Sequence, residues 1–199
     1  MNFSIKSLGV IPAQERIDLA VKLKECFDPQ KESGFVGLSE EEYQTLITGQ
    51  GACRNFYVLC AQNKFAGVVE LVFTDSAIEL DALFVEPNYR HQGLGRLLVS
   101  AALYYAAMHV LTRQTAIHHL EISVLKRTID LERTLQFFEC LGATRQPEGF
   151  YLQDGINYPT HRLRLNLPDC LDTLKSQLEP FLCKQRDTHE IDSPQSMRP

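Results

Sequence analysis

The stretch Val85–Leu103, VEPNYRHQGLGRLLVSAAL, runs from an apolar segment through a turn with two glycines into an amphipathic helix. Gly93 and Gly95 stand two residues apart where that helix begins. The first N–H groups of a helix have no backbone partner, and the helix dipole adds partial positive charge at the same end. A glycine-rich turn that opens a helix is therefore typical of an anion-binding site.

Composition narrows the class of protein. The chain has 199 residues, enough for one domain with a sizeable core or for one domain and an extension. Its net charge of −5 argues against nucleic acid as a partner and is compatible with a cationic or amine-bearing substrate. The sequence has no apolar run of membrane-spanning length, and its first residues lack the pattern of a signal peptide. We therefore expect a soluble, cytoplasmic protein with no membrane partner.

The six cysteines do not indicate a metal site. They form no CxxC pair, and no spacing of cysteines with histidines matches a known set of metal ligands. We expect ordinary free thiols and no bound metal.

The hydrophobic periodicity predicts a mixed α/β domain. Alternating or short apolar runs predict strands, helical spacing predicts helices, and Ser39 with Glu42 is typical of a capping box. The expected strands are 3–7, 55–61, 65–73, 77–85, 119–125, 149–153 and 161–167, with a loop at 154–159. The expected helices are 13–27, 38–47, one after Gly95, and 131–141. An antiparallel meander in the middle distinguishes this order from a run of βαβ units.

Two common phosphate-binding motifs do not fit the glycine turn. The dinucleotide fingerprint needs a third small residue where Leu98 stands, and it needs an early βαβ unit instead of a preceding meander. The P-loop needs Gly-Lys followed by Ser or Thr, which the chain lacks.

The segment instead resembles the donor-binding segment of the GNAT superfamily, the acyl-CoA-dependent N-acyltransferases. The family signature is Arg or Gln, two residues, Gly, one residue, then Gly or Ala, and Arg90, Gly93 and Gly95 match it. The preceding strand, Pro87 and the following helix match in order, and the resemblance extends from residue 3 to about Leu167. It implies an α/β (α+β) fold in which a mixed, mostly antiparallel sheet of about seven strands carries helices on both faces.

The resemblance also implies acetyl-CoA as the acyl donor. Backbone N–H groups of the turn would cradle the pyrophosphate, and the backbone of Leu83 and Val85 would pair with the pantetheine like an added strand. Arg90 and Arg96 either add charge or are solvated cations near the site. The expected donor-binding residues are Leu83, Phe84, Val85, Arg90, His91, Gln92, Gly93, Leu94, Gly95 and Arg96.

Two carboxylates are candidates for the general base. An alkyl amine with a pKa of about 10 is mostly protonated at neutral pH, so a base assists acyl transfer. Strand alternation is expected to place Glu79, Asp81, Leu83 and Val85 on one side of the strand 77–85. The resemblance implies that Glu79 or Asp81 is the base. The alternative is that both are half-exposed structural carboxylates.

The usual general acid of the family is missing. A Tyr often lies four residues before the glycine that ends the later helix and protonates the leaving sulfur, but here Phe138 precedes Gly142 at that spacing. Tyr151 or Tyr158 from the last strands is a candidate substitute. Catalysis does not require the acid, because a thiol with a pKa of about 8.5 leaves tolerably as the thiolate.

The expected activity is transfer of an acetyl or other acyl group from acetyl-CoA to a primary amine by direct attack in a ternary complex. The alternative is a CoA-binding regulatory or interaction module with little turnover, which the absence of the usual Tyr favours. Acceptor specificity is expected in the two early helices and the loop 154–159. Glu40, Glu41 and Glu42 either attract a cation there or form a solvated helix start.

Three regions are expected along the chain: an acyltransferase domain at 1–167, a helical extension at 168–185, and a disordered tail at 186–199. The extension is a candidate contact for a homodimer or another partner.

Overall fold

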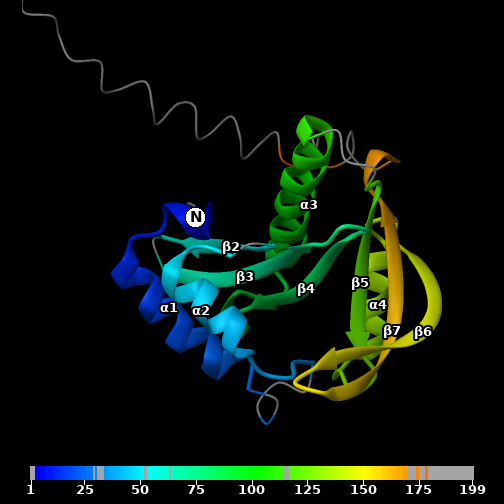
Figure 1. Cartoon of the computed structure of the whole chain (residues 1–199), viewed down its shortest axis with the longest axis horizontal. Helices are drawn as coiled ribbons and strands as arrows, with labels where there is room; N and C mark the ends of the chain where they lie inside the picture. Colours follow the sequence, from blue (N-terminus) through cyan, green and yellow to red (C-terminus); the bar gives the residue numbers. More distant parts are fainter. Residues whose placement is uncertain are drawn as a thin grey trace, which may run out of the picture.

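One seven-stranded sheet organises the protein (Figure 1). The computed structural model describes residues 3–28, 30, 34–51, 53–62, 64–113, 117–169, 174 and 178. The strands are β1 (Phe3–Ser7), β2 (Arg54–Ala61), β3 (Lys64–Phe73), β4 (Ile78–Val85), β5 (His119–Leu125), β6 (Thr144–Gln153) and β7 (Ile156–Asn166). Their order is β1-β2-β3-β4-β5-β7-β6, and β4 with β5 is the parallel pair among these strands. The predicted mixed, mostly antiparallel sheet is confirmed.

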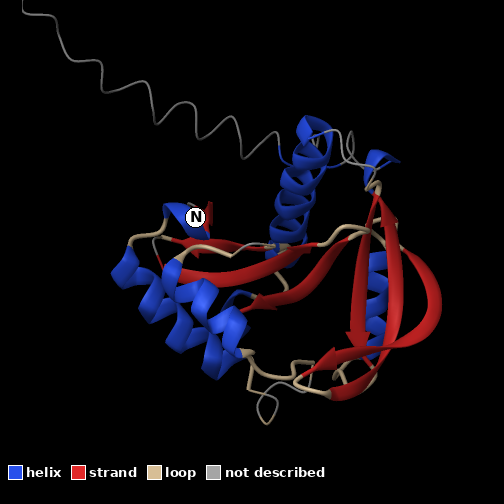
Figure 2. Ribbon diagram, in the orientation of Figure 1, coloured by secondary structure: helices blue, strands red, loops and turns tan. Residues whose placement is uncertain are grey.

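Helices cover both faces of the sheet, as predicted (Figure 2). They are α1 (Ala13–Cys26), α2 (Glu40–Thr48), α3 (Leu94–Arg113) and α4 (Leu131–Glu139), with short 3-10 turns at Leu8–Val10 and Pro87–Tyr89. The larger apolar cluster packs α3 and α4 on one face, and the smaller cluster packs α1 and α2 on the other. None of the helices in the described part of the chain is long and apolar enough to span a membrane.

The sheet opens between β4 and β5. These strands pair only at Ile78–Leu80 with Leu120–Ile122, and beyond that point they diverge (Figure 1). β4 stays paired with β3 as far as Val85, and β5 stays paired with β7 as far as Leu125. The last five residues of β4 therefore present a free strand edge inside the protein, of the kind to which an extended ligand can add.

The β6–β7 connection is shorter than the sequence analysis predicts. The expected loop at 154–159 is a two-residue turn, Asp154-Gly155, and β7 already begins at Ile156. Both turn residues have positive φ, +52° and +77°, which suits a tight hairpin because its twist matches that of the strands. Tyr151 consequently pairs with Tyr158 inside the hairpin. The Asp-Gly pair was the available signal for this turn.

Most of the predicted extension at 168–185 and the whole tail at 186–199 lie outside the described residues. Leu174 and Leu178 are described, with exposed fractions of 3% and 4%, and both belong to the larger apolar cluster together with Leu167. These leucines therefore contribute to the core of their own chain. The homodimer contact stays a prediction.

Replacing Leu178 with alanine is expected to lower the free energy of unfolding by about 2–5 kcal/mol, because it removes a buried side chain from a packed cluster. Urea denaturation followed by circular dichroism measures the change. Leu152→Ala, at a side chain 64% exposed, is the control and should stay within about 0.5 kcal/mol of wild type. Equal midpoints for L178A and wild type would contradict the packing of Leu178.

Candidate active site

A pocket of about 680 Å³ lies where β4 and β5 separate. Its walls come from β4, β5, α4 and the turn that opens α3, and residues 34–35 of the α1–α2 connection close one part. All of the expected donor-binding residues line this pocket except Gln92, whose amide instead donates to the Asn88 carbonyl at 3.2 Å.

The turn before α3 presents backbone N–H groups to the pocket. His91 and Gly93 have positive φ, +63° and +78°. Leu97 N donates to the Gly93 carbonyl at 3.1 Å, so the N–H groups of the three residues between them have no acceptor within the helix. A Cβ built at Gly93 meets no atom within 4 Å, which leaves open space beside the turn. The turn has the geometry of an anion site.

Arginine side chains surround this turn. Arg90 Nε donates to the Val85 carbonyl at 2.8 Å, so this side chain also ties the turn to the end of β4. Arg133, from α4, also lines the pocket and places Nη2 2.9 Å from His91 Nδ1. The sequence analysis did not identify Arg133, because 42 residues separate it from His91 and only the fold brings the two together.

A β-bulge in β4 changes the direction of its side chains. Glu70 pairs with Ala82 and Leu71 pairs with Leu80, which leaves Asp81 without a partner on β3. Leu83 and Val85 therefore pack on the α3 side, whereas Ala82 belongs to the cluster on the α1–α2 side. The predicted common side for Glu79, Asp81, Leu83 and Val85 is wrong, because an extra residue in the strand reverses the alternation.

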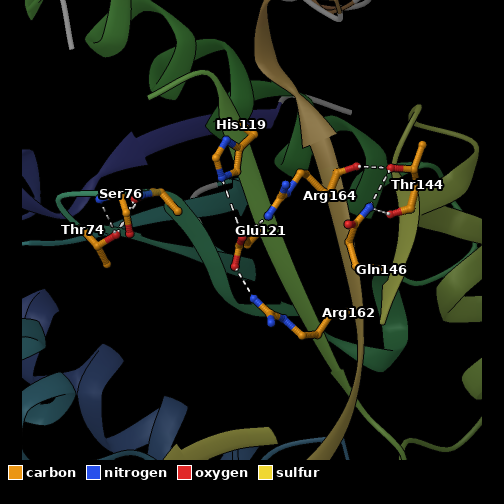
Figure 3. Close-up of polar contacts among 9 residues, drawn as sticks. Thr74, Ser76, His119, Glu121, Thr144, Gln146, Arg162 and Arg164 are labelled. Carbon is orange, nitrogen blue, oxygen red and sulfur yellow. Dashed lines mark hydrogen bonds and ion pairs between the residues drawn. The ribbon is translucent and has the colours of Figure 1, made fainter. Parts of the chain in front are cut away.

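The two candidate bases occupy different environments. Asp81 lines the pocket, and Glu79 does not. Burial raises the pKa of Glu79, and the charges of Asp81 and Glu121 raise it further. Next to Glu79, Glu121 accepts hydrogen bonds from Arg162 at 2.7 Å and Arg164 at 2.9 Å in a network across β5 and β7 (Figure 3).

Asp81 belongs to an acidic cluster that four elements build. The cluster consists of Glu42 from α2, Glu70 from β3 and Asp81 from β4, gathered around Arg54 from β2. Arg54 Nη1 lies 2.6 Å from Glu70 Oε1, 3.0 Å from Asp81 Oδ2 and 3.7 Å from Glu42 Oε1. The Arg54 guanidinium therefore supplies positive charge to all three of these carboxylates.

The Asp81 carboxylate has one anchored oxygen and one free oxygen. Oδ2 lies 3.0 Å from Arg54 Nη1 and 3.4 Å from the Tyr151 hydroxyl. Oδ1 receives no hydrogen bond from any residue that the structure describes. Burial raises the pKa of Tyr151, and the charges of Asp81 and Glu42 raise it further, so its hydroxyl stays a neutral donor. Asp81 is thus held in place with a lone pair available.

The candidate acids differ in position as well. Phe138 is buried, lines the pocket and has no proton to give. The Arg127 guanidinium lies over the Tyr158 ring, with its Cζ 5.1 Å from the centre of that ring. Tyr151 is the tyrosine that reaches the acidic cluster, although it does not line the pocket itself.

Glu70 is the most deeply buried member of the cluster. Its side chain has no exposed surface, and Oε2 has no hydrogen-bond partner. Burial raises the pKa of Glu70 well above its usual value, the charges of Asp81 and Glu42 raise it further, and Arg54 opposes the shift. A carboxyl in this position favours its protonated form.

Glu70→Gln should therefore change how stability depends on pH. Between the unfolded and the raised folded pKa of Glu70, the folded protein binds more protons than the unfolded chain, so the free energy of unfolding falls as pH rises. The amide cannot ionise, so E70Q should lose this decline and gain stability over wild type toward alkaline pH. Urea denaturation from pH 5 to 9 tests this. If the free energy of unfolding of E70Q fell relative to that of wild type as the pH rises, the result would contradict the raised pKa of Glu70.

Comparison with known proteins identifies the central part of the chain. Residues 52–142 match the family model described as the acetyltransferase (GNAT) domain. No curated protein matches the sequence.

Solved structures share the fold. The ribosomal-protein-S18-alanine N-acetyltransferase from Escherichia coli is 18% identical with a TM-score of 0.59, and the match covers 83% of this chain and 94% of that one. The spermidine N-acetyltransferase from Vibrio cholerae, in complex with CoA and spermine, is 15% identical with a TM-score of 0.61. That match covers 85% of this chain and 98% of that one. A GNAT-family acetyltransferase from Streptococcus pneumoniae is 14% identical with a TM-score of 0.61, covering 83% and 99%. Residues 52–142 are thus similar to the GNAT acetyltransferase domain, and the chain as a whole shares the fold of these solved acetyltransferases.

Proposed function

We propose that this protein transfers an acetyl group from acetyl-CoA to a primary amine, by direct attack of the amine in a ternary complex. The observation that carries the proposal is one pocket with an anion-binding turn on one wall and the free Oδ1 of Asp81 on another. The free edge of β4 runs between these two features.

The residues of the pocket fit the parts of acetyl-CoA. The backbone N–H groups before Leu97 suit the pyrophosphate, and Arg96 and Arg133, which also line the pocket, add positive charge. The edge of β4 at Leu83 and Val85 suits the pantetheine amides. When bound, the donor supplies a thioester carbonyl, and we assign its oxyanion donor to a backbone N–H around Val85.

Asp81 is the group that we assign as general base. It lines the pocket, Arg54 and Tyr151 fix its Oδ2, and its Oδ1 faces no competing donor among the described residues. The acceptor ammonium gives a proton to Oδ1, directly or through one water, and the neutral amine then attacks the thioester carbonyl. The C–S bond breaks as the amide forms, CoA leaves as the thiolate, and the second proton lost by the nitrogen neutralises that thiolate directly or through water. Glu79 lies outside the lining, so we assign it no contact with the reacting atoms.

We assign the acceptor to the primary amines. Two similar proteins are named for acceptors of this class, spermidine and the alanine of ribosomal protein S18. At 15–18% identity this likeness shows the fold alone, so the assignment rests on the match of residues 52–142 to the GNAT acetyltransferase domain and on the carboxylates near the pocket.

Gly93→Trp should abolish or weaken CoA binding by at least about tenfold, because the side chain would fill the space beside the turn. Gly155→Trp is a matched control: Gly155 has φ +77° against +78° at Gly93, and a Cβ there also meets no atom within 4 Å. Calorimetric titration of both variants and wild type with CoA gives the comparison. Wild-type protein that binds no CoA would refute the donor assignment, and equal loss in both variants would remove the role of the turn.

Asp81→Asn should lower kcat/KM by about 10²- to 10⁴-fold with CoA binding unchanged, as expected for loss of a general base. Release of free thiol from acetyl-CoA measures the rate across a panel of primary amines. Glu79→Gln should cause a smaller loss, and the reverse order would transfer the role to Glu79. If wild type binds CoA but acetylates no amine, the protein is the CoA-binding module that the sequence analysis keeps as its alternative.

A further inference from the structure

The strand β6 forms one outer edge of the seven-stranded sheet (Figure 1). Among the described strands it pairs with β7 alone, so its other side offers backbone N–H and C=O groups to a further strand. The opposite edge, β1, has five residues and carries Lys6, and both features discourage pairing with another chain. β6 is twice as long, with ten residues.

The two halves of β6 differ in how well they are protected. The first half contains Arg145, Pro147 and Glu148, and a β-bulge interrupts its pairing with β7 just before Gly149. Charges, proline and bulges are the usual means by which an edge strand avoids pairing. The second half, Gly149–Gln153, contains no charge, no proline and no bulge. This second half is therefore open to a further strand.

Two large apolar side chains lie exposed in the open half of β6. Phe150 has an exposed fraction of 70%, and Leu152 has one of 64%. Because they are two residues apart on a strand, they point to the same face, on which Pro159 of β7 lies opposite Phe150. The other face is directed at the site, since the Tyr151 hydroxyl donates to Asp81 at 3.4 Å. The apolar pair thus lies at the surface, on the face away from the acidic cluster.

The hydrogen bonding of β7 indicates which backbone groups of β6 point outward. The Pro159 carbonyl accepts from Lys126 N at 3.0 Å, on the side of β7 that faces β5. Pro159 therefore directs its backbone away from β6, and its pair with Phe150 is a non-hydrogen-bonded pair. In consequence the N–H and C=O of Phe150 point to the open edge, and by alternation along the strand those of Leu152 do the same.

We propose that two copies of this chain associate through this edge, with Gly149–Gln153 of one copy antiparallel to the same segment of the other. A two-fold axis beside Tyr151 sets Phe150 opposite Leu152 of the partner subunit, and the reverse pair follows by symmetry. Each pair exchanges two hydrogen bonds, because both of its residues have outward backbone groups. The same register gathers four apolar side chains on one face.

The segment is complementary to itself in this one register, which is why we assign the edge to a second copy. A shift by one residue sets the outward groups against residues whose own groups face β7. A shift by two residues restores the hydrogen bonds but sets Glu148 or Asp154 opposite an apolar side chain. In the proposed register these two carboxylates meet only beyond the paired segment, and Lys126, in contact with Glu148, compensates their repulsion.

Sedimentation velocity between about 1 and 200 µM protein tests the association, because dimer formation depends on concentration. Wild type should shift from the mass of one chain to that of two. Phe150→Glu should raise the dissociation constant of the dimer at least about tenfold, because it sets a charge against an apolar side chain of the partner. Ile156→Glu is the matched control: Ile156 is 54% exposed in the same hairpin but lies on β7, away from the open edge, and should leave the constant unchanged.

Three results would each overturn the proposal: a wild type that stays monomeric throughout, an F150E dimer as tight as wild type, or equal loss in F150E and I156E. In dilute solution, where the chains are separate, both variants should unfold at the same urea concentration as wild type, because both side chains are exposed. This comparison distinguishes loss of association from loss of the fold.

Amide hydrogen exchange followed by NMR tests the register. The amides of Phe150 and Leu152 should exchange more slowly as the wild-type concentration rises, whereas those of Tyr151 and Gln153, which face β7, should not change. A dimer whose Phe150 and Leu152 amides stay unprotected would associate through another face and overturn the proposal. A monomer in which they become protected only when an octapeptide of alternating Thr and Val is added would assign the edge to a peptide partner, and would overturn it too. None of these measurements involves CoA or an amine, so their outcome is independent of the proposed function.

Discussion

Beyond Leu80 and Ile122, β4 and β5 no longer share hydrogen bonds, and the geometry of the site follows from this separation. Each strand stays paired on its outer side, so neither loses its shape. The free inner edge of β4 forms a pocket wall, and α3 begins a few residues beyond the end of that edge. A sheet paired along its whole length would fill this space with backbone, and the turn before α3 would have no pocket beside it.

The bulge at Asp81 adds a second constraint at the same point of the sheet. The extra residue turns Leu83 and Val85 toward α3 and leaves the carboxylate of Asp81 among side chains from α2, β2 and β3. The strand thus supports two chemically different surfaces within five residues. Toward its end it offers backbone groups and an anion-binding turn, and at the bulge it offers a carboxylate held by an arginine.

Local patterns in the sequence predicted much of this structure. The turn of Arg90 to Arg96 is contiguous in the sequence, and Gly93, with φ +78°, supplies the left-handed backbone conformation that the turn requires. The capping box at Ser39 is likewise local, and it forms as predicted. The bulge was not predictable from alternation, because Ile78–Val85 reads as a regular strand and the register depends on its pairing with β3.

The acidic cluster was beyond prediction for the same reason. In the sequence, Glu42 has the pattern of a capping-box residue, and Arg54 and Glu70 have the pattern of ordinary strand residues. Only the fold of the sheet and its helices brings these three residues to Asp81. Arg133 and His91 meet in a similar way across the pocket. Residues whose role depends on contacts between distant elements carry no periodic or spacing signal, whereas the residues of a single turn do.

The burial of Leu174 and Leu178 has a consequence for how the chain is made. Both lie in the apolar cluster that packs α3 and α4, although the meander of β2, β3 and β4 already ends at Val85. During synthesis, the meander and α3 emerge before these leucines, so the nascent chain exposes an unfinished apolar surface in the meantime. The cluster closes only after the segment that carries Leu174 and Leu178 has also emerged, which gives chaperones an interval in which to act.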